Sequence, residues 1–430
     1  MAKIYIYDEF SPEDTAMMQA LYSRSPKSVV EHVEKVKNSG SGKFMETFYI
    51  GYGHASIADC GSTTIFIEDV SILADKAIQD WQLYSGQETS TRYIDMGSRA
   101  IIDPLGTPTS QAILKQWMNF YNNSQEEVIK HLKEKYPKKE NEDDLIYNKA
   151  IKARCFDITR GFLPAGITTQ LSWHTNLRQA YDKLCWLKNN PLNEISTIAN
   201  DILKQLKEKY PNSFCQPIIK EQENYRQTVA NKYNFLQPKN ISELKMITNI
   251  KNEDLSIYQE IIDKRPDKTG LPNFLGELGT ISFEFNLDFG SFRDIQRHRN
   301  GICRMPLLTT TLGFGDWYLE QLPESLKSKA KELITKQTEA INNLDVSDEI
   351  KQYYIAMGFN VFCKVTYNLP ATAYVIELRS GKPVHPTLRK VAHQMYYSLQ
   401  KSLPNLKLKC DLEPDDWDYR RGLQDIIKKQ

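Results

Sequence analysis

The sequence predicts an α+β protein made of two tandem, related strand-and-helix units, each with an antiparallel sheet packed by helices. Three observations support this prediction. Residues 280–289 alternate between apolar and polar side chains, which is typical of a strand with one buried face. Residues 193–210 and 387–403 have the apolar spacing of amphipathic helices. Residues 62–86 resemble residues 279–303 when the two stretches are aligned without a gap.

Composition excludes several classes of protein. A chain of 430 residues is long enough for two or three domains. Its 55 Lys and Arg against 54 Asp and Glu argue against general binding to nucleic acid or to a membrane surface. No apolar run reaches the ~18–20 residues of a membrane span, and the first residues have no signal-peptide pattern. Because the seven cysteines are scattered and form no C-x-x-C pair, we expect no disulfide framework, no metal site and a cytoplasmic location.

The similarity between the halves consists of weak matches that occur in the same order. In the gap-free alignment Thr63 matches Thr280, and Phe66 matches Phe283. In the same alignment Ile78-Gln79 matches Ile295-Gln296. Further along the chain, "FLPA" (162–165) resembles "NLPA" (368–371), and "NLR" (176–178) resembles "ELR" (377–379). Finally, "YPNS" (210–213) resembles "LPNL" (403–406). We interpret this order as an old tandem duplication.

The duplication divides the chain into a first half at residues 1–225, a connector at 226–270 and a second half at 271–430. The connector is rich in Lys and Asn and contains three prolines, which favours a helical or irregular structure. Within the first half, residues 131–144 are highly charged and are expected to form the end of a helix and an exposed loop.

An arginine cluster follows the predicted strand of the second half. Gly290 is expected to end that strand, and Ser291 with Asp294 to form a capping box that opens a short helix. Residues 292–308 then hold Arg293, Arg297, His298, Arg299 and Arg304. Apolar residues lie between them, so the segment is expected to be partly buried. Because an arginine taken out of water needs a partner, an anion-binding role is favoured over a solvated basic surface.

The corresponding stretch of the first half is polar. Glu88, Ser90 and Arg92 lie in a short run that ends at Tyr93. Hydroxyl, guanidinium and backbone N–H groups together suit a phosphate monoester, because arginine can donate two parallel hydrogen bonds to it. The alternative is a loop with an incidental Glu–Arg pair.

These stretches resemble the flavin-dependent thymidylate synthases. The signature of that family runs from Arg-His-Arg through Ser to Glu, Ser, Arg and Tyr, and here it is divided between the halves. The second half has Arg297, His298 and Arg299 but not the remainder. The first half has Asp80-Trp81-Gln82 instead of Arg-His-Arg, but keeps Ser85, Glu88, Ser90, Arg92 and Tyr93.

The resemblance implies a role for individual residues. The substrate nucleotide would be bound by Glu88, Ser90, Arg92, Arg160 and Gln296. The flavin would be bound by His54 and Ser56 of "GHAS", by Asn176 and Arg178 of "NLR", and by Arg297, His298 and Arg299. The family arginine proposed to polarise the uracil ring lies about eleven residues beyond the Asn, where this chain has Leu187, and the second half has Glu377 in place of that Asn. Candidates for the missing cation are Arg379, His385 and Arg389, and we take Arg389 as the catalytic residue.

The resemblance implies reductive methylation of dUMP to dTMP, with FAD as cofactor and with methylenetetrahydrofolate and NADPH as co-substrates. Since each half keeps a different part of the signature, we expect composite sites in a homodimer that resembles a family tetramer. Two alternatives stay open: a catalytically inactive nucleotide-binding or scaffolding paralogue, and a flavin- and folate-dependent methylase of another pyrimidine nucleotide. RNA binding is disfavoured, because the arginine cluster is single and short.

Overall fold

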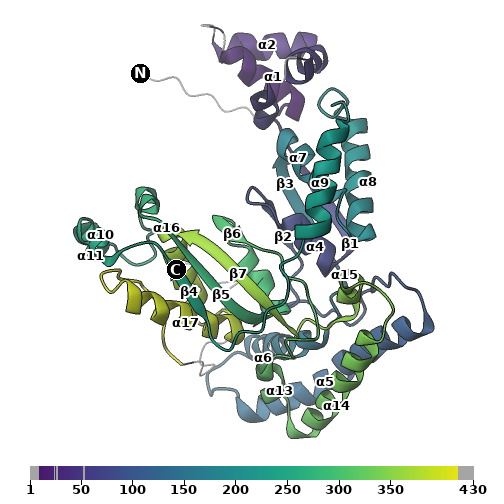
Figure 1. Ribbon diagram of the computed structural model, residues 1–430, viewed down its shortest axis with the longest axis vertical. Coiled ribbons are helices and arrows are strands. Elements are labelled where there is room, and N and C mark those ends of the chain that lie inside the picture. Colours follow the sequence, from purple (N-terminus) through teal and green to yellow (C-terminus); the bar gives the residue numbers. More distant parts are fainter. Residues whose placement is uncertain (1–8, 24, 26–27, 52–53, 415–430) are drawn as a thin grey trace. The chain divides into compact units, whose positions relative to one another are not determined.

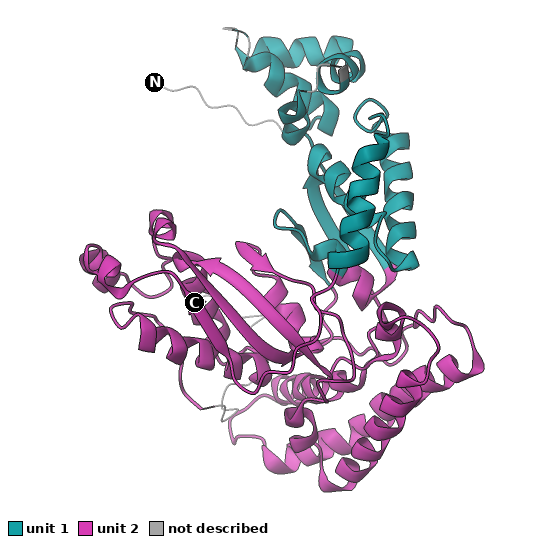
Figure 2. Cartoon of the chain, in the orientation of Figure 1, with its two compact units in different colours: residues 1–68, 77–88, 170–234 teal, residues 69–76, 89–169, 235–430 magenta. Residues whose placement is uncertain are grey.

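A computed structural model describes residues 9–23, 25, 28–51 and 54–414 of the chain. These residues form two compact units, each assembled from separate stretches of the sequence (Figure 2). Unit 1 comprises residues 1–68, 77–88 and 170–234, and unit 2 comprises residues 69–76, 89–169 and 235–430. The outermost parts of the two predicted halves, residues 1–8 and 415–430, lie outside the described residues.

Unit 1 contains a three-stranded sheet with the strand order β1-β3-β2, and several helices (Figure 1). Strand β2 is antiparallel to β3, with Ser85 opposite His174. In β3, Leu171 and Trp173 are buried and alternate with more exposed residues, so the sheet has one buried face. The elements are β1 (Ser62–Ser71), β2 (Ser85–Glu88), β3 (Thr168–Asn176), α1 (Pro12–Tyr22), α2 (Val29–Ser39), α3 (Gly42–Phe44), α7 (Leu177–Leu187), α8 (Asn193–Lys209) and α9 (Lys220–Tyr233).

Unit 2 contains a four-stranded antiparallel sheet with the order β4-β5-β7-β6, and helices pack against its apolar face. The strands are β4 (Lys245–Thr248), β5 (Thr280–Asp288), β6 (Gly301–Cys303) and β7 (Asn360–Asn368). The longer helices are α5 (Pro108–Lys135), α6 (Asp144–Thr159), α12 (Phe289–Gln296), α14 (Glu324–Asn342), α16 (Leu369–Ser380) and α17 (Pro386–Ser402). Shorter ones are α10 (Asn252–Ser256), α11 (Gln259–Asp263), α13 (Asp316–Glu320) and α15 (Asp348–Lys351). The predicted α+β class with two antiparallel sheets is confirmed.

The predicted strand of the second half is confirmed as β5, and its apolar residues Ile281, Phe283, Phe285 and Leu287 are buried. The predicted capping box is wrong. Helix α12 begins at Phe289, and the carboxylate that caps it belongs to Asp288, whose Oδ1 accepts from Ser291 N at 2.9 Å. Gly290 is therefore part of the helix. A Cβ at this position would lie 3.2 Å from Asp288 Oδ1, so a larger residue would require a small shift of that carboxylate.

The order of elements repeats along the chain, as the duplication predicts. The first half runs β1, α4 (Ile72–Gln79), β2, β3, α7, α8, and the second half runs β5, α12, β6, β7, α16, α17. The two sheets also share one strand order, since β1-β3-β2 corresponds to β5-β7-β6. In both halves an Asn caps the helix after the third strand: Asn176 accepts from Gln179 N at 2.8 Å, and Asn368 from Ala371 N at 3.0 Å.

The gap-free alignment of the halves is wrong within the first strand. Buried Ile67 of β1 corresponds to buried Phe285 of β5, and buried Val70 corresponds to buried Leu287. Strand β1 therefore has one residue more between the two positions. Asp69, with φ of 56°, is that extra residue, and an insertion of this kind forms a β-bulge.

Two predicted matches change as a result. Phe66, which was matched to Phe283, is 75% exposed, because it precedes the bulge and points to the other face of its strand. The match between "NLR" and "ELR" is also wrong. The counterpart of Asn176 is Asn368, because both residues end the third strand and cap the next helix, whereas Glu377 lies inside α16.

Three further predictions concern local structure. Helices α8 and α17 confirm the amphipathic patterns, and the charged segment contains the end of α5 at Lys135 and an exposed stretch before Asp143 caps α6. The connector contains helices, but also the strand β4, which pairs with β5. Within the described residues, no helix combines the length and apolarity needed to cross a membrane.

Candidate functional site

Unit 2 gathers arginines from both halves around one buried carboxylate, Asp294 of α12. Burial alone would raise the pKa of this carboxyl group, but nearby arginines favour its charged form and hold the pKa at about 2. These are Arg297, Arg379, Arg92 and Arg160, in order of decreasing effect. Arg297 Nη1 lies 3.5 Å from Asp294 Oδ1. We call these five residues, together with Asp157 and His298, the arginine site.

Arg92 is held by a carboxylate of helix α6. Its Nε donates to Asp157 Oδ1 at 2.7 Å and its Nη2 to Asp157 Oδ2 at 3.2 Å, while Nη1 donates to Pro383 O at 3.4 Å. Ser90 shapes the preceding turn, because its Oγ accepts from Arg92 N at 3.3 Å. The bidentate pair fixes the plane of the guanidinium and leaves hydrogens on Nη1 and Nη2 that can be donated to an anion.

Arg160 is enclosed by protein, with 1% of its surface exposed. Its Nη2 donates to Ser291 Oγ at 3.0 Å. Burial alone would lower the pKa of the guanidinium, but Tyr318 and Asp288 raise it above its ordinary value. Arg160 therefore lies behind the surface of the arginine site.

A hydrogen-bonded network surrounds Arg160. Asp288 is buried and accepts three hydrogen bonds, from Ser291 N at 2.9 Å, Tyr318 Oη at 2.6 Å and Thr387 Oγ1 at 2.6 Å. The imidazole Nδ1 of His385 lies 2.8 Å from Thr387 Oγ1. Burial holds the pKa of His385 well below its ordinary value, and Arg160 lowers it further. The network is thus a neutral imidazole and hydroxyls arranged around one carboxylate and one guanidinium.

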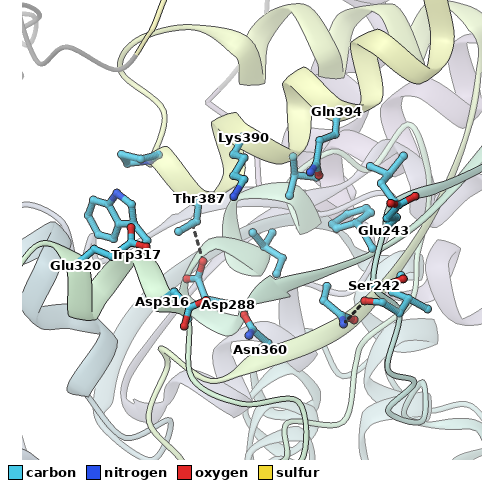
Figure 3. A pocket seen from close by; sticks show the side chains of 18 residues that line it. Ser242, Glu243, Asp288, Asp316, Trp317, Glu320, Asn360, Thr387, Lys390 and Gln394 are labelled. Atoms are coloured by element: carbon cyan, nitrogen blue, oxygen red, sulfur yellow. Dashed lines mark hydrogen bonds between the residues drawn. The ribbon is translucent and has the colours of Figure 1, made fainter. Parts of the chain in front are cut away.

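A cavity of about 470 Å³ borders this network (Figure 3). Thr387 and Asp288, joined by their hydrogen bond, form part of its wall, and Trp317 and Lys390 line it as well. Its volume lies in the range of small-molecule sites, ~300–1,000 Å³. The cavity thus borders the network that also holds Arg160.

The Arg-His-Arg sequence presents side chains of different exposure. The side chain of Arg297 is 42% exposed, whereas His298 is buried and accepts from Arg379 Nε at 2.7 Å through Nε2. Arg299 Nη1 donates to Arg297 O at 3.3 Å. Gln296, predicted to bind substrate, is buried and donates to Lys76 O at 3.2 Å. Arg297 is therefore the member best placed to meet a ligand from solvent.

Arg389, the predicted catalytic residue, is buried and holds the segment after α17. Its Nε donates to Ser380 O at 2.6 Å, and its Nη2 to Glu413 O at 2.6 Å and to Asp411 Oδ1 at 3.1 Å. The structure places Arg379 in the arginine site instead. Since Asn368 is the counterpart of Asn176, Arg379 stands about eleven residues beyond it, where the resemblance locates the arginine that polarises the uracil ring.

The remaining predicted residues lie in unit 1. Glu88 Oε2 accepts from Gln79 Nε2 at 2.6 Å. His54 is exposed and its ring stacks on Phe48 at 6.4 Å, while Ser56 O accepts from Cys60 Sγ at 3.6 Å. Gly53 of the same motif lies outside the described residues. Asn176 acts as the cap of α7.

Arg178, the last predicted flavin contact, pairs with a carboxylate. Its Nε and Nη2 each donate to Asp59 at 2.8 Å, and Nη1 lies 3.6 Å from Asp182. The hydrogen bonds to Asp59 raise the pKa of this guanidinium. The arginine is thus held in one orientation and stays partly exposed.

Fold and site together define an α+β protein with a doubled sheet unit and an arginine-lined site suited to anionic groups. The family model described as thymidylate synthase complementing protein matches residues 7–212, just under half of the chain. Over these residues the chain is similar to this family.

Three curated relatives extend the similarity over both halves. Proteins described as UPF0159 proteins are 25% identical in Chlamydia muridarum, over 80% of this chain and 76% of the relative, and 24% identical in Chlamydia pneumoniae, over 85% and 79%. One of Thermoplasma acidophilum is 22% identical, over 91% of this chain and 94% of the relative. Each match covers at least three quarters of both proteins and therefore includes residues of both halves of this chain.

Proposed function

We propose that this protein is a flavin-dependent thymidylate synthase that converts dUMP to dTMP with methylenetetrahydrofolate, FAD and NADPH. One observation carries the proposal: Arg92 from the first half and Arg297 and Arg379 from the second half surround Asp294 within unit 2. Because the signature is divided between the two halves, a complete site requires signature residues of both halves to lie close together. The similarity of residues 7–212 to the thymidylate synthase complementing protein family supports the same reaction class.

The chemistry of the donors fits FAD and dUMP, which both carry phosphate. Arg92, whose guanidinium plane is fixed by its hydrogen bonds to Asp157, would bind the phosphate of dUMP. Arg297 would neutralise a flavin phosphate. Arg379 donates to His298 and to Asp294 O, and in the part of the chain that the structure describes its Nη1 has no partner. That nitrogen would face negative charge that develops on the uracil ring. Bound FAD would supply the hydride.

The nucleotide role of Arg92 is tested by Arg92→Ala. We expect the affinity for dUMP to fall by roughly 1.5–3 kcal/mol, the scale of a hydrogen bond to a charged group, and FAD affinity to change much less. Isothermal titration with dUMP and FAD measures both. Arg226→Ala is the matched control, because Arg226 is ion-paired on α9 of unit 1. Unchanged dUMP affinity in a folded Arg92→Ala protein would exclude this residue from the phosphate site.

The proposed function is tested by the visible spectrum of the purified protein and by its reduced flavin. We expect FAD to bind, and the reduced flavin to be oxidised when dUMP and methylenetetrahydrofolate are added. A protein that stays colourless with added FAD would overturn the proposal. An inactive nucleotide-binding paralogue is the second candidate, favoured by the burial of Arg160. Such a paralogue would bind dUMP without any oxidation of flavin.

The number of sites follows from the divided signature. The second half has the cations Arg297 and Arg299, whereas residues 80–82 of the first half are Asp, Trp and Gln. We therefore expect one FAD and one dUMP per chain, and two of each in a homodimer. Titration combined with the mass in solution measures this ratio. Two flavins per chain would show that each half forms a site of its own.

A further inference from the structure

The contact between Arg379 and His298 defines where the imidazole proton is. Arg379 Nε lies 2.7 Å from His298 Nε2. A guanidinium has only N–H donors and no acceptor, so Nε2 must provide the lone pair. A histidine with a lone pair on Nε2 is neutral and carries its proton on Nδ1. The arrangement is rigid, because Arg379 Nη2 also donates to Asp294 O at 2.6 Å.

The surroundings of His298 favour the same neutral form. The residue is 8% exposed, and burial is the main reason that its pKa falls to about 3. The charged groups that face it are Arg379 from α16, and Asp294, Arg297 and Arg299 from its own segment. Tyr374 of α16 adds a ring at 5.9 Å, edge to face. Three cations against one carboxylate disfavour a second proton on the imidazole.

We propose that Arg379 is a positioning residue that fixes His298 as a neutral imidazole with its proton on Nδ1, so that this N–H can be donated to an acceptor atom of a bound flavin or nucleotide. Among the described residues Nδ1 has no hydrogen-bond partner. The use of this proton in turnover rests on the proposed function, whereas the protonation state of His298 does not.

The test is an NMR experiment on the full-length protein, with ¹⁵N-labelled histidine and without ligand. The chain has seven histidines, and the signal of His298 is identified by its loss in His298→Gln. We expect the Nδ1–H pattern from about pH 5.5 to 8, the interval in which an ordinary histidine titrates. Arg379→Gln removes the charged donor to Nε2, so we expect the proton to exchange between Nδ1 and Nε2 and the pKa of His298 to rise, although burial still holds that pKa below its ordinary value. Arg379→Lys keeps a charged donor and should keep the wild-type pattern.

Arg299→Gln is the matched control, because it removes a neighbouring charge but leaves the hydrogen bond to His298 in place. We expect its tautomer to be unchanged. A wild-type His298 that titrates near about pH 6.5, or that carries its proton on Nε2, would overturn the proposal. So would an equal effect of Arg299→Gln and Arg379→Gln. The measurement is made without flavin, so its result does not depend on whether the protein is a thymidylate synthase.

Discussion

Asp288→Ala is expected to lower the free energy of unfolding by about 3–5 kcal/mol, the range for breaking a buried charged network by removal of one partner. Asp288 is buried and accepts from Ser291 N, Tyr318 Oη and Thr387 Oγ1. Without its carboxylate, two hydroxyl groups lose their acceptor, and the Arg160 guanidinium loses a compensating charge. Urea unfolding followed by circular dichroism measures the change.

Asp316→Ala is the matched control for this prediction. Asp316 lines the same cavity as Asp288, but it is exposed, so its removal should change stability by no more than about 0.5 kcal/mol. The double variant Asp288→Ala, Arg160→Met should be less destabilised than Asp288→Ala alone, because no uncompensated charge remains buried. Equal stability of Asp288→Ala and Asp316→Ala would show that the network contributes nothing.

Arg379→Ala is expected to reduce dUMP-dependent oxidation of the reduced flavin by about 10²–10³-fold, the effect of removing one preorganised donor from an active site. The substitution removes both the cation in the arginine site and the donor that fixes His298. Flavin and dUMP occupancy should change less, since Arg297 and Arg92 remain. Single-turnover kinetics at saturating dUMP separate the two effects.

Arg389→Ala tests whether the catalytic cation is Arg379 or Arg389, the residue that the sequence alone suggested. Arg389 contacts Ser380, Asp411 and Glu413, so its loss should lower stability while the folded, flavin-loaded protein keeps most of its turnover rate. If instead Arg389→Ala stops turnover in folded protein and Arg379→Ala does not, the catalytic role belongs to Arg389.

A strand could be predicted from the sequence where the alternation of apolar and polar residues continues over many positions. Nine residues of β5 alternate clearly, whereas β4 has only four residues and was hidden in a Lys-rich stretch. The duplication was predictable from the order of matches, but not its register. One extra residue, Asp69, turns all preceding side chains of β1 to the opposite face, and no gap-free comparison can represent that change.

Several arginines of the site could be predicted from the sequence, but the carboxylates that pair with them could not. Arg92 and Arg297 belong to recognisable motifs, but Asp157 lies 65 residues from Arg92 in sequence. The sequence offered one indication that Asp157 belongs to the site: it lies three residues before Arg160, so a helix would place the two residues on the same face. Burial was the other unpredictable quantity. Arg160 and Arg389 look like site arginines in the sequence, and only packing shows that their guanidinium groups bond to the protein.

The bonds of Arg389 also have a consequence for synthesis. This guanidinium lies in α17, and its acceptors on Asp411 follow it by 22 residues. At ~5–20 residues per second, a ribosome needs about 1–4 s to add that stretch. Arg389 therefore gains its acceptors on Asp411 and Glu413 only after α17 has been synthesised, whereas its acceptor on Ser380 precedes it in the chain.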